Sequence, residues 1–274
     1  MRSHVKLAPL VILVLWPAAA LAAEPSATAV DHDVENPLGK EWVFKLQNET
    51  YLLQITEFDA HEVNQVLQLQ PRLSFPLGEQ FYVVARPKFL FFDSIPYKSA
   101  SDTLARNQGL GDLELPIVLS LNLGPHWIEG IGPTFTLPTA TTPQTGAGKW
   151  QAGPAVVLGW QTSRWMAALL AQQWWSFAGE SSRASTSKLN IQYFLARYFA
   201  GGWSIGMSPT ISVDWKAAQA VTLPIGLGAA RTFVLGDTVS LQLGAQALYM
   251  IVRPDNFGQQ AQFELTVAPV LERL

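Results

Sequence analysis

The sequence predicts an all-β chain that folds as a transmembrane antiparallel up-and-down β-barrel of about 12 strands. Three observations support this fold class: a period of two in the apolar residues, connections that alternate between short and long, and tryptophans at the strand ends. Only 14% of the 274 residues are charged, whereas soluble domains have about 25%. The chain has no cysteine, which excludes disulfide frameworks and thiolate metal sites.

The first residues have the pattern of an export signal. Arg2 and Lys6 give a positive start, the stretch 7–16 is apolar, and 20–22 is a small-x-small cleavage site. An apolar stretch of about 15 residues is shorter than a membrane-spanning helix. We therefore expect a cleaved signal peptide at 1–22.

The rest of the chain is expected to form a polar periplasmic segment at 23–41 and an outer-membrane β-barrel at 42–274. Cleavage takes Lys plus Arg from 18 to 16 against 21 Asp plus Glu, so the mature net charge is −5. A net negative charge disfavours a nucleic-acid partner.

Alternating apolar and polar residues are clearest at 113–123, 203–215 and 263–271. A helix would spread such residues around its whole circumference, so these stretches predict strands. The first strand is irregular around Asn48 to Thr50, where we expect a bulge. The predicted strands are 42–56, 63–76, 80–93, 110–123, 127–138, 150–162, 165–177, 186–199, 203–215, 221–234, 237–251 and 260–272.

The connections between these strands alternate in length, as the periplasmic turns and external loops of a membrane barrel do. The first connection, near Asp59 to Glu62, is short but takes a long-loop position. The tight turns are at 77–78, 124–125, 163, 200–202 and 235–236. The longer loops are at 94–109, 139–149, 178–185, 216–220 and 252–259.

A soluble β-sandwich also alternates, but it turns its apolar face inward. A barrel of about 12 strands is wider than its own side chains fill, so its apolar face should meet lipid. The tryptophans favour the barrel because they form two aromatic girdles at the strand ends. Trp165 and Trp175 would stand ~25 Å apart along the axis, the height of an apolar membrane band. The predicted girdle is Trp42, Trp127, Trp150, Trp160, Trp165, Trp174, Trp175, Trp203 and Trp215.

The polar face of the strands is expected to line the lumen. Arg86 and Lys88 on the third strand are placed to meet Glu114 on the fourth, either as a brace of the wall or as a constriction that selects solutes. Whether the polar segment 23–41 plugs the lumen or trails in the periplasm stays open. The predicted lumen-lining residues are Gln68, Gln70, Arg72, Arg86, Lys88, Glu114, Asn122, Lys188, Asn190, Gln192, Ser208, Thr210, Asp214, Gln242, Gln246 and Glu264.

Catalytic and metal sites have weak support in the sequence, and we expect no enzyme activity, cofactor or metal. His61 is the one candidate base in an external loop, and no serine is adjacent to it. Asp31-His32-Asp33 contains metal-ligand residue types in a single short stretch, which is little evidence for a site. The glycines at 109–111 precede a strand rather than a helix, so they do not form a phosphate loop.

Several stretches resemble the outer-membrane family named after the meta-cleavage pathway of phenol degradation, the MetA-pathway transporter family. They are 36–39 followed by Trp42 and 46–48, then 67–71, 109–113, 132–140 and 153–155. The resemblance spans 36–274 and implies an outer-membrane barrel that moves small, often hydrophobic or aromatic, compounds. It supplies no catalytic residues.

The expected function is therefore a channel or transporter for small compounds in the outer membrane. The expected partners are outer-membrane lipid, the assembly machinery and an unidentified solute, and the expected state is a monomer. Barrels of this kind often end in an aromatic residue that the machinery recognises, whereas this chain ends Glu272-Arg273-Leu274. The alternatives are a structural or adhesive barrel without flux, an outer-membrane lipid-modifying enzyme and a soluble periplasmic β-protein.

Overall fold

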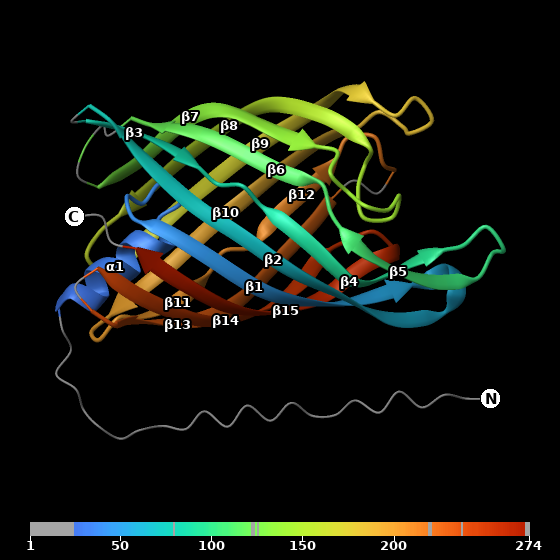
Figure 1. Ribbon diagram of the computed structural model, residues 1–274. Helices are drawn as coiled ribbons and strands as arrows, with labels where there is room; N and C mark the ends of the chain where they lie inside the picture. Colours follow the sequence, from blue (N-terminus) through green and yellow to red (C-terminus); the bar gives the residue numbers. More distant parts are fainter. Residues whose placement is uncertain are drawn as a thin grey trace.

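The chain forms one closed β-barrel (Figure 1). The computed structural model describes residues 25–78, 80–121, 124, 126–218, 221–236 and 238–271, so the expected signal peptide and Asn122 lie outside the described residues. Neighbouring strands are antiparallel. β1 (Trp42–Ile55) pairs with both β2 (Ala60–Leu77) and β15 (Asn256–Leu271), and this second pairing closes the sheet.

The remaining segments complete the circle between β2 and β15. Three consecutive pairs, β3 with β4, β5 with β6 and β11 with β12, each make one barrel strand, so the 15 segments form 12 strands and the predicted fold class is confirmed. The bounds are β3 Phe81–Ala85, β4 Phe89–Lys98, β5 Leu104–Leu110, β6 Leu113–Ser120, β7 Trp127–Leu137, β8 Lys149–Gln161, β9 Trp165–Gly179, β10 Ser187–Phe199, β11 Trp203–Met207, β12 Thr210–Asp214, β13 Val221–Val234 and β14 Val239–Val252.

Prolines account for two of the three interruptions. Pro87 lies between β3 and β4, and Pro209 lies between β11 and β12. Proline has no backbone N–H, so it cannot donate to the ladder. Neighbouring bonds hold the wall together there: the Lys88 N–H donates to the Glu114 carbonyl at 2.8 Å, and the Tyr193 N–H donates to the Pro209 carbonyl at 3.1 Å.

Two sequence predictions about the strands near the long-loop end were wrong. The predicted loop at 94–109 is mostly a hairpin, because β4 continues to Lys98 and β5 begins at Leu104. The bulge expected at Asn48 to Thr50 lies further along, where the β1–β15 register shifts at 52/53 and 54/55. There the chain leaves the wall and enters the short 3₁₀ turn η1 (Thr56–Phe58).

A tight glycine turn joins β10 to β11 at the short-turn end. Gly201 and Gly202 have φ of 77° and 69°, in the left-handed region that favours glycine. A Cβ on Gly202 would also lie 2.6 Å from the Thr232 carbonyl oxygen. Glycine at this position therefore lets the turn approach β13 closely.

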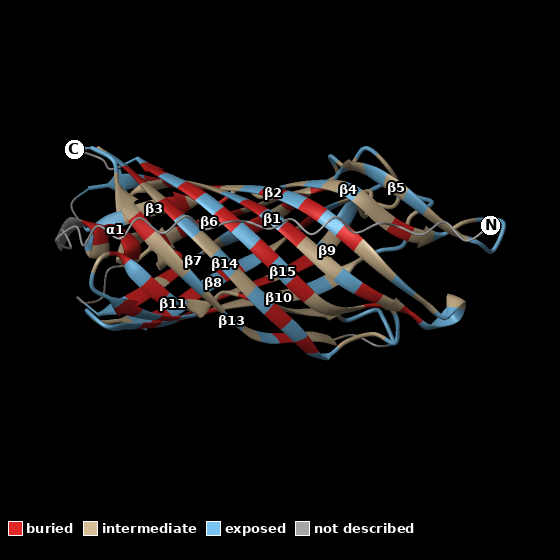
Figure 2. Ribbon diagram, turned by 90° about the horizontal axis from the view of Figure 1, so that it is seen from below, coloured by how far each residue is buried: buried red, intermediate tan, exposed pale blue. Residues whose placement is uncertain are grey.

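Along most of the wall the side chains alternate between the two faces, and Figure 2 shows the resulting bands. On β9, Trp165 and Ala167 are exposed, whereas Met166, Ala168 and Leu170 are buried inside. The exposed residues of the wall are mostly leucine, isoleucine, valine, phenylalanine and tryptophan. An apolar exterior around a partly polar interior is the arrangement of a transmembrane barrel, and a single closed sheet excludes a sandwich.

The interior is filled with apolar side chains at the short-turn end. Val84, Val118, Met166 and Phe194, from four different segments, pack in one buried cluster with Leu38 of the N-terminal segment. The expectation that the barrel is too wide for its own side chains to fill is therefore wrong for this half. Large residues and an inserted segment close it together.

The inserted segment begins with a helix that the sequence analysis missed. α1 (Pro25–Glu35) lies at the short-turn end of the barrel, against β10, β11, β13 and β14 (Figure 1). Val30 and Val34 are buried against Val43, Ala268 and Val270 of the wall. Segment 25–41 is therefore a plug. Among the described residues, no helix is both long and apolar enough to cross a membrane.

We expect Leu227→Arg to destabilise the barrel by about 2–4 kcal/mol, because a charge near the middle of a membrane-spanning strand must leave water. Leu227 lies in the middle of β13 and is 63% exposed on the outer face. Urea unfolding in lipid vesicles measures the loss. The matched control is Gln192→Arg, which faces the interior, and equal losses for both variants would contradict the outward apolar face.

Candidate functional site

The candidate site is a cavity of about 430 Å³ inside the barrel, between the middle of the wall and the long-loop end. Eight glutamines and two asparagines line it, together with one lysine, three glutamates and the rings of Tyr51, Phe92 and Phe257. These groups offer many hydrogen-bond donors and acceptors and a few aromatic faces. Such a lining suits a small organic molecule that is only partly apolar.

The predicted lumen residues divide into three groups by position. Ten line the cavity: Gln68, Gln70, Lys88, Glu114, Asn190, Gln192, Ser208, Thr210, Gln246 and Glu264. Arg72, Arg86 and Gln242 are buried deeper, towards the plug. Lys188 and Asp214 are register partners at the long-loop end of β10 and β12.

Several cavity residues on β1 and its neighbours were not predicted from the sequence. Gln47, Glu49 and Tyr51 follow one another at every second position of β1 and line the cavity, as do Asn64 and Gln172. The spacing Gln-x-Glu-x-Tyr indicates that these three side chains share one face of the strand. It was overlooked because Asn48 and Thr50 on the other face made the strand look irregular.

An ion pair joins two of the predicted charges. The Lys88 ammonium pairs with the Glu114 carboxylate, and a backbone bridge links the same two residues. Arg86 does not join them. Its guanidinium lies 5.7 Å from the centre of the Phe194 ring, and within the described chain its Nε and Nη1 have no hydrogen-bond partner.

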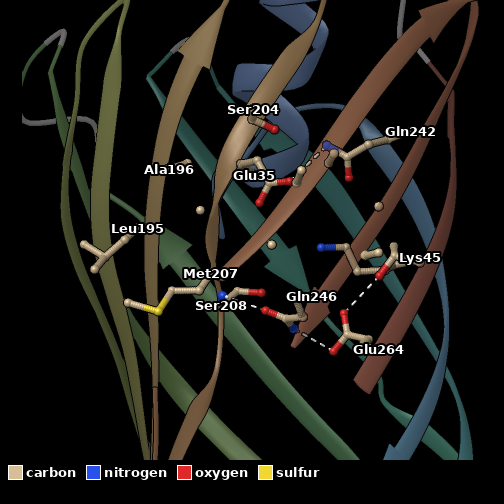
Figure 3. Close-up of a pocket in the computed structure, with 17 residues that line it drawn as sticks. Glu35, Lys45, Leu195, Ala196, Ser204, Met207, Ser208, Gln242, Gln246 and Glu264 are labelled. Carbon is tan, nitrogen blue, oxygen red and sulfur yellow. Dashed lines mark hydrogen bonds between the residues drawn. The ribbon is translucent and has the colours of Figure 1, made fainter. Parts of the chain in front are cut away.

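A chain of amide hydrogen bonds crosses the closing seam of the barrel. The Gln68 Nε2 donates to the Gln47 Oε1 at 2.7 Å, and the Gln47 Nε2 donates to the Glu264 Oε1 at 2.5 Å. The Gln246 Nε2 donates to the other carboxylate oxygen at 2.8 Å, and the Thr266 hydroxyl donates to Oε1 at 2.9 Å. Figure 3 shows Gln246 between Ser208 and Glu264. The bonds hold these side chains in fixed positions around the cavity.

Arg72 is the main polar anchor of the plug. Its guanidinium pairs with the Asp33 carboxylate and donates to the backbone carbonyls of Asp33, Val34, Asn36 and Glu41. Arginine suits this position because its planar group carries five donors.

The chain passes very close to this guanidinium at Gly39. A Cβ there would lie 2.4 Å from the Asp33 carbonyl oxygen and 2.6 Å from the Arg72 Cζ, so only glycine fits without a shift of both groups.

Asp31 is the second anchor, and it is fully buried. Its Oδ1 accepts hydrogen bonds from Thr232 at 2.9 Å, Gln242 at 3.0 Å and Ser204 at 3.4 Å. Burial, with repulsion from Glu35, raises the pKa of Asp31 from 3.8 to about 7, although the three hydrogen bonds lower it. Figure 3 shows the neighbouring Glu35 reaching Gln242.

The helix points Asp31, His32 and Asp33, the three residues with metal-ligand side chains, in different directions. Asp31 faces β11, β13 and β14, and Asp33 pairs with Arg72. The His32 ring stacks 3.8 Å from the Tyr198 ring, and burial lowers the His32 pKa below 6.5. His61 is exposed on β2.

The structure places most of the predicted girdle tryptophans on the outer face and one in the interior. Trp127, Trp150, Trp160, Trp165, Trp175, Trp203 and Trp215 are exposed on the outer face, and Trp42 is half-buried. Trp174 is only 3% exposed and faces the interior. It cannot share a face with Trp175, because adjacent residues of a strand point to opposite faces.

Comparison with known proteins supports the fold. The chain matches no protein-family model, and its sequence matches no curated protein. A solved outer membrane channel from Pseudomonas putida F1 superposes with a TM-score of 0.62 at 14% identity, covering 85% of this chain and 95% of that chain. The NanC porin superposes with a TM-score of 0.50 at 8% identity, covering 84% and 100%.

This chain has the fold of outer-membrane β-barrels. Outer membrane phospholipase A from Escherichia coli is also similar, with a TM-score of 0.42 at 13% identity, covering 84% of this chain and 90% of that one. That likeness is too low to carry an argument about activity. Since no family model matches, the resemblance to the MetA-pathway family stays a prediction.

The raised pKa of Asp31 implies that docking of the plug weakens as the pH rises. An undocked Asp31 has a pKa near 3.8, whereas the docked residue holds its proton up to about pH 7. The stability that protonated Asp31 gives to the docked plug is therefore complete below pH 3.8. It is lost as the pH rises through about 7. Protonation of His32 acts in the opposite direction at acid pH, because burial lowers its pKa.

A spin label at Ala29→Cys reports on docking, since Ala29 is exposed on α1 and the chain has no other cysteine. We expect the label to become more mobile as the pH rises from about 5 to about 7 in the otherwise unchanged chain. With Asp31→Asn as well, it should stay immobile over that range. The same pH response in both proteins would contradict the role of Asp31.

Proposed function

We propose that this protein is an outer-membrane channel for small compounds that carry hydrogen-bonding groups, aromatic groups or both. The observation that carries the proposal is the 430 Å³ cavity, which is lined by amides and aromatic rings inside a barrel with an apolar exterior. A barrel that only anchored or adhered would not need a polar chamber of ligand size.

The channel is closed in this conformation. Below the cavity lie the plug and the apolar cluster, and the two smaller spaces near them have volumes of about 60 and 20 Å³. Passage therefore requires the plug to shift, which makes Arg72 and Asp31 the residues that hold the closed state. Their contacts are hydrogen bonds and one ion pair, which water can replace when the plug shifts.

The resemblance at 36–274 supports the same function, and we propose that the chain is a member of the MetA-pathway transporter family. We also propose export by the signal peptide at 1–22, insertion in the outer membrane by the assembly machinery, a monomeric state and the absence of enzyme activity. The Trp girdle facing lipid is consistent with this location.

A structural barrel without flux is the second candidate. The filled half of the interior favours it, because this cluster and the plug occupy the short-turn end of the barrel. Release of the plug distinguishes the two candidates, since only the channel would then conduct.

Planar-bilayer recording of the refolded mature protein separates the candidates. Arg72→Ala removes the buried partner of Asp33 and should cost the docked state about 3 kcal/mol. We expect the open probability to rise by about a hundredfold. The matched control is Arg106→Ala, since Arg106 pairs with Glu62 on the external hairpin and touches no part of the plug.

Heat-modifiable gel mobility confirms that both variants are folded. Channel openings that become frequent in the Arg72 variant alone support the proposal. A folded Arg72 variant with a mobile plug and no conductance would contradict the channel and leave the structural barrel.

A further inference from the structure

Two carboxylates face each other across the closing seam of the barrel. Glu49 on β1 and Glu264 on β15 are directly opposite in register, and both line the 430 Å³ cavity. Each residue is only 7% exposed. Like charges opposite each other destabilise a sheet, and buried acidic residues are nearly always paired. The arrangement therefore needs an explanation.

No neighbouring cation among the described residues forms an ion pair with these two carboxylates. Lys88 pairs with Glu114 instead. Lys45 and Glu264 both line the small cavity nearer the plug (Figure 3), yet they form no ion pair. The larger cavity thus has three carboxylates and one ammonium group along its lining.

Among the described residues, one acceptor in the same cavity has no hydrogen-bond partner. Asn64 is 7% exposed and lines the same cavity, and its Oδ1 accepts no hydrogen bond from any described residue. In register, Asn64 is the partner of Tyr51, which is two residues along β1 from Glu49. A buried acceptor without a donor costs about 1–3 kcal/mol. Together these acceptors are suited to a ligand that donates hydrogen bonds and carries positive charge.

We propose that the Glu49–Glu264 pair, with Asn64, binds the ammonium group of a small organic cation. This inference deepens the proposed channel function and rests on it for the route by which the cation arrives. An ammonium group has three N–H donors and suits scattered acceptors. A metal ion fits less well, because the described residues contain no group of three or more His, Asp or Glu side chains that could hold one.

The rest of the lining defines the remainder of the ligand. A volume of 430 Å³ is far larger than an ion and matches a small organic molecule. The rings of Tyr51, Phe92 and Phe257 line the cavity, and the Tyr51 hydroxyl donates to Glu49 at 2.5 Å. Aromatic faces attract both cations and other rings. The ligand class is therefore an amine with an aromatic or similarly compact apolar body.

Three compounds of nearly equal shape test the charge preference: benzylammonium, benzoate and benzyl alcohol. Calorimetry on the refolded full mature chain in detergent measures binding without requiring transport. We expect benzylammonium to bind saturably and at least about tenfold more tightly than the other two. Glu49→Gln and Glu264→Gln should each weaken its binding by about tenfold.

The matched control is Asp102→Asn, which removes one negative charge from the external hairpin. Asp102 has φ of 61°, a conformation that asparagine tolerates, and the ion pair with Lys98 that it loses is exposed, so we expect the hairpin to keep its fold. Both glutamate variants relieve repulsion between buried charges, so we expect them to fold, and heat-modifiable mobility checks this. The Asp102 variant should bind benzylammonium as the original chain does.

Equal binding of benzylammonium and benzoate, or benzylammonium binding that neither glutamate substitution changes, would overturn the inference. The bilayer recordings keep this test separate from the proposed function. Selective binding without conductance would support the ammonium site and contradict the channel function. Conductance without selective binding would support the channel function and contradict the ammonium site.

Discussion

The antiparallel pairing of β1 with β15 is the constraint on which the rest of the structure depends. A wall in lipid must satisfy its own backbone polar groups, and only a closed sheet leaves no open edge. The pairing runs from Trp42–Leu271 to Ile55–Asn256. It also brings Glu264 beside Glu49 and Gln47, so the seam that closes the barrel builds the most polar part of the cavity.

The interior of the closed barrel has two halves, which differ in the contacts that their side chains make. Towards the short turns, apolar residues and the plug pack as in a soluble core, with Arg72 and Asp31 as the polar anchors. Towards the long loops, glutamine and glutamate side chains surround open space. Opening the half towards the short turns costs energy, because its buried polar groups would lose their hydrogen-bond partners. The second half is ready to receive a ligand, and this asymmetry underlies the proposed closed channel.

The wall could be predicted from sequence and the plug could not. Period-two alternation is a local property, so it identified the barrel strands, the outward apolar face and such cavity residues as Glu114 and Gln246. α1 was not predicted because it is short and weakly amphipathic. Its stability comes from contacts such as the hydrogen bond between Asp31 and Gln242, which are 211 residues apart in sequence. Glu49 was not predicted for a similar reason. Its place in the acidic pair depends on the pairing of β1 with β15, which are far apart in sequence.

The most direct test of the account is the accessibility of adjacent β14 positions in lipid vesicles. The chain has no cysteine, so Ala245→Cys, Gln246→Cys and Ala247→Cys each give a single thiol. The structure turns position 246 towards the cavity and positions 245 and 247 outward. A small charged methanethiosulfonate should modify the thiol at 246 rapidly and the thiols at 245 and 247 hardly at all, because lipid excludes the reagent. Equal reaction at the three positions, or the reverse order, would contradict a barrel with lipid outside and a polar chamber within.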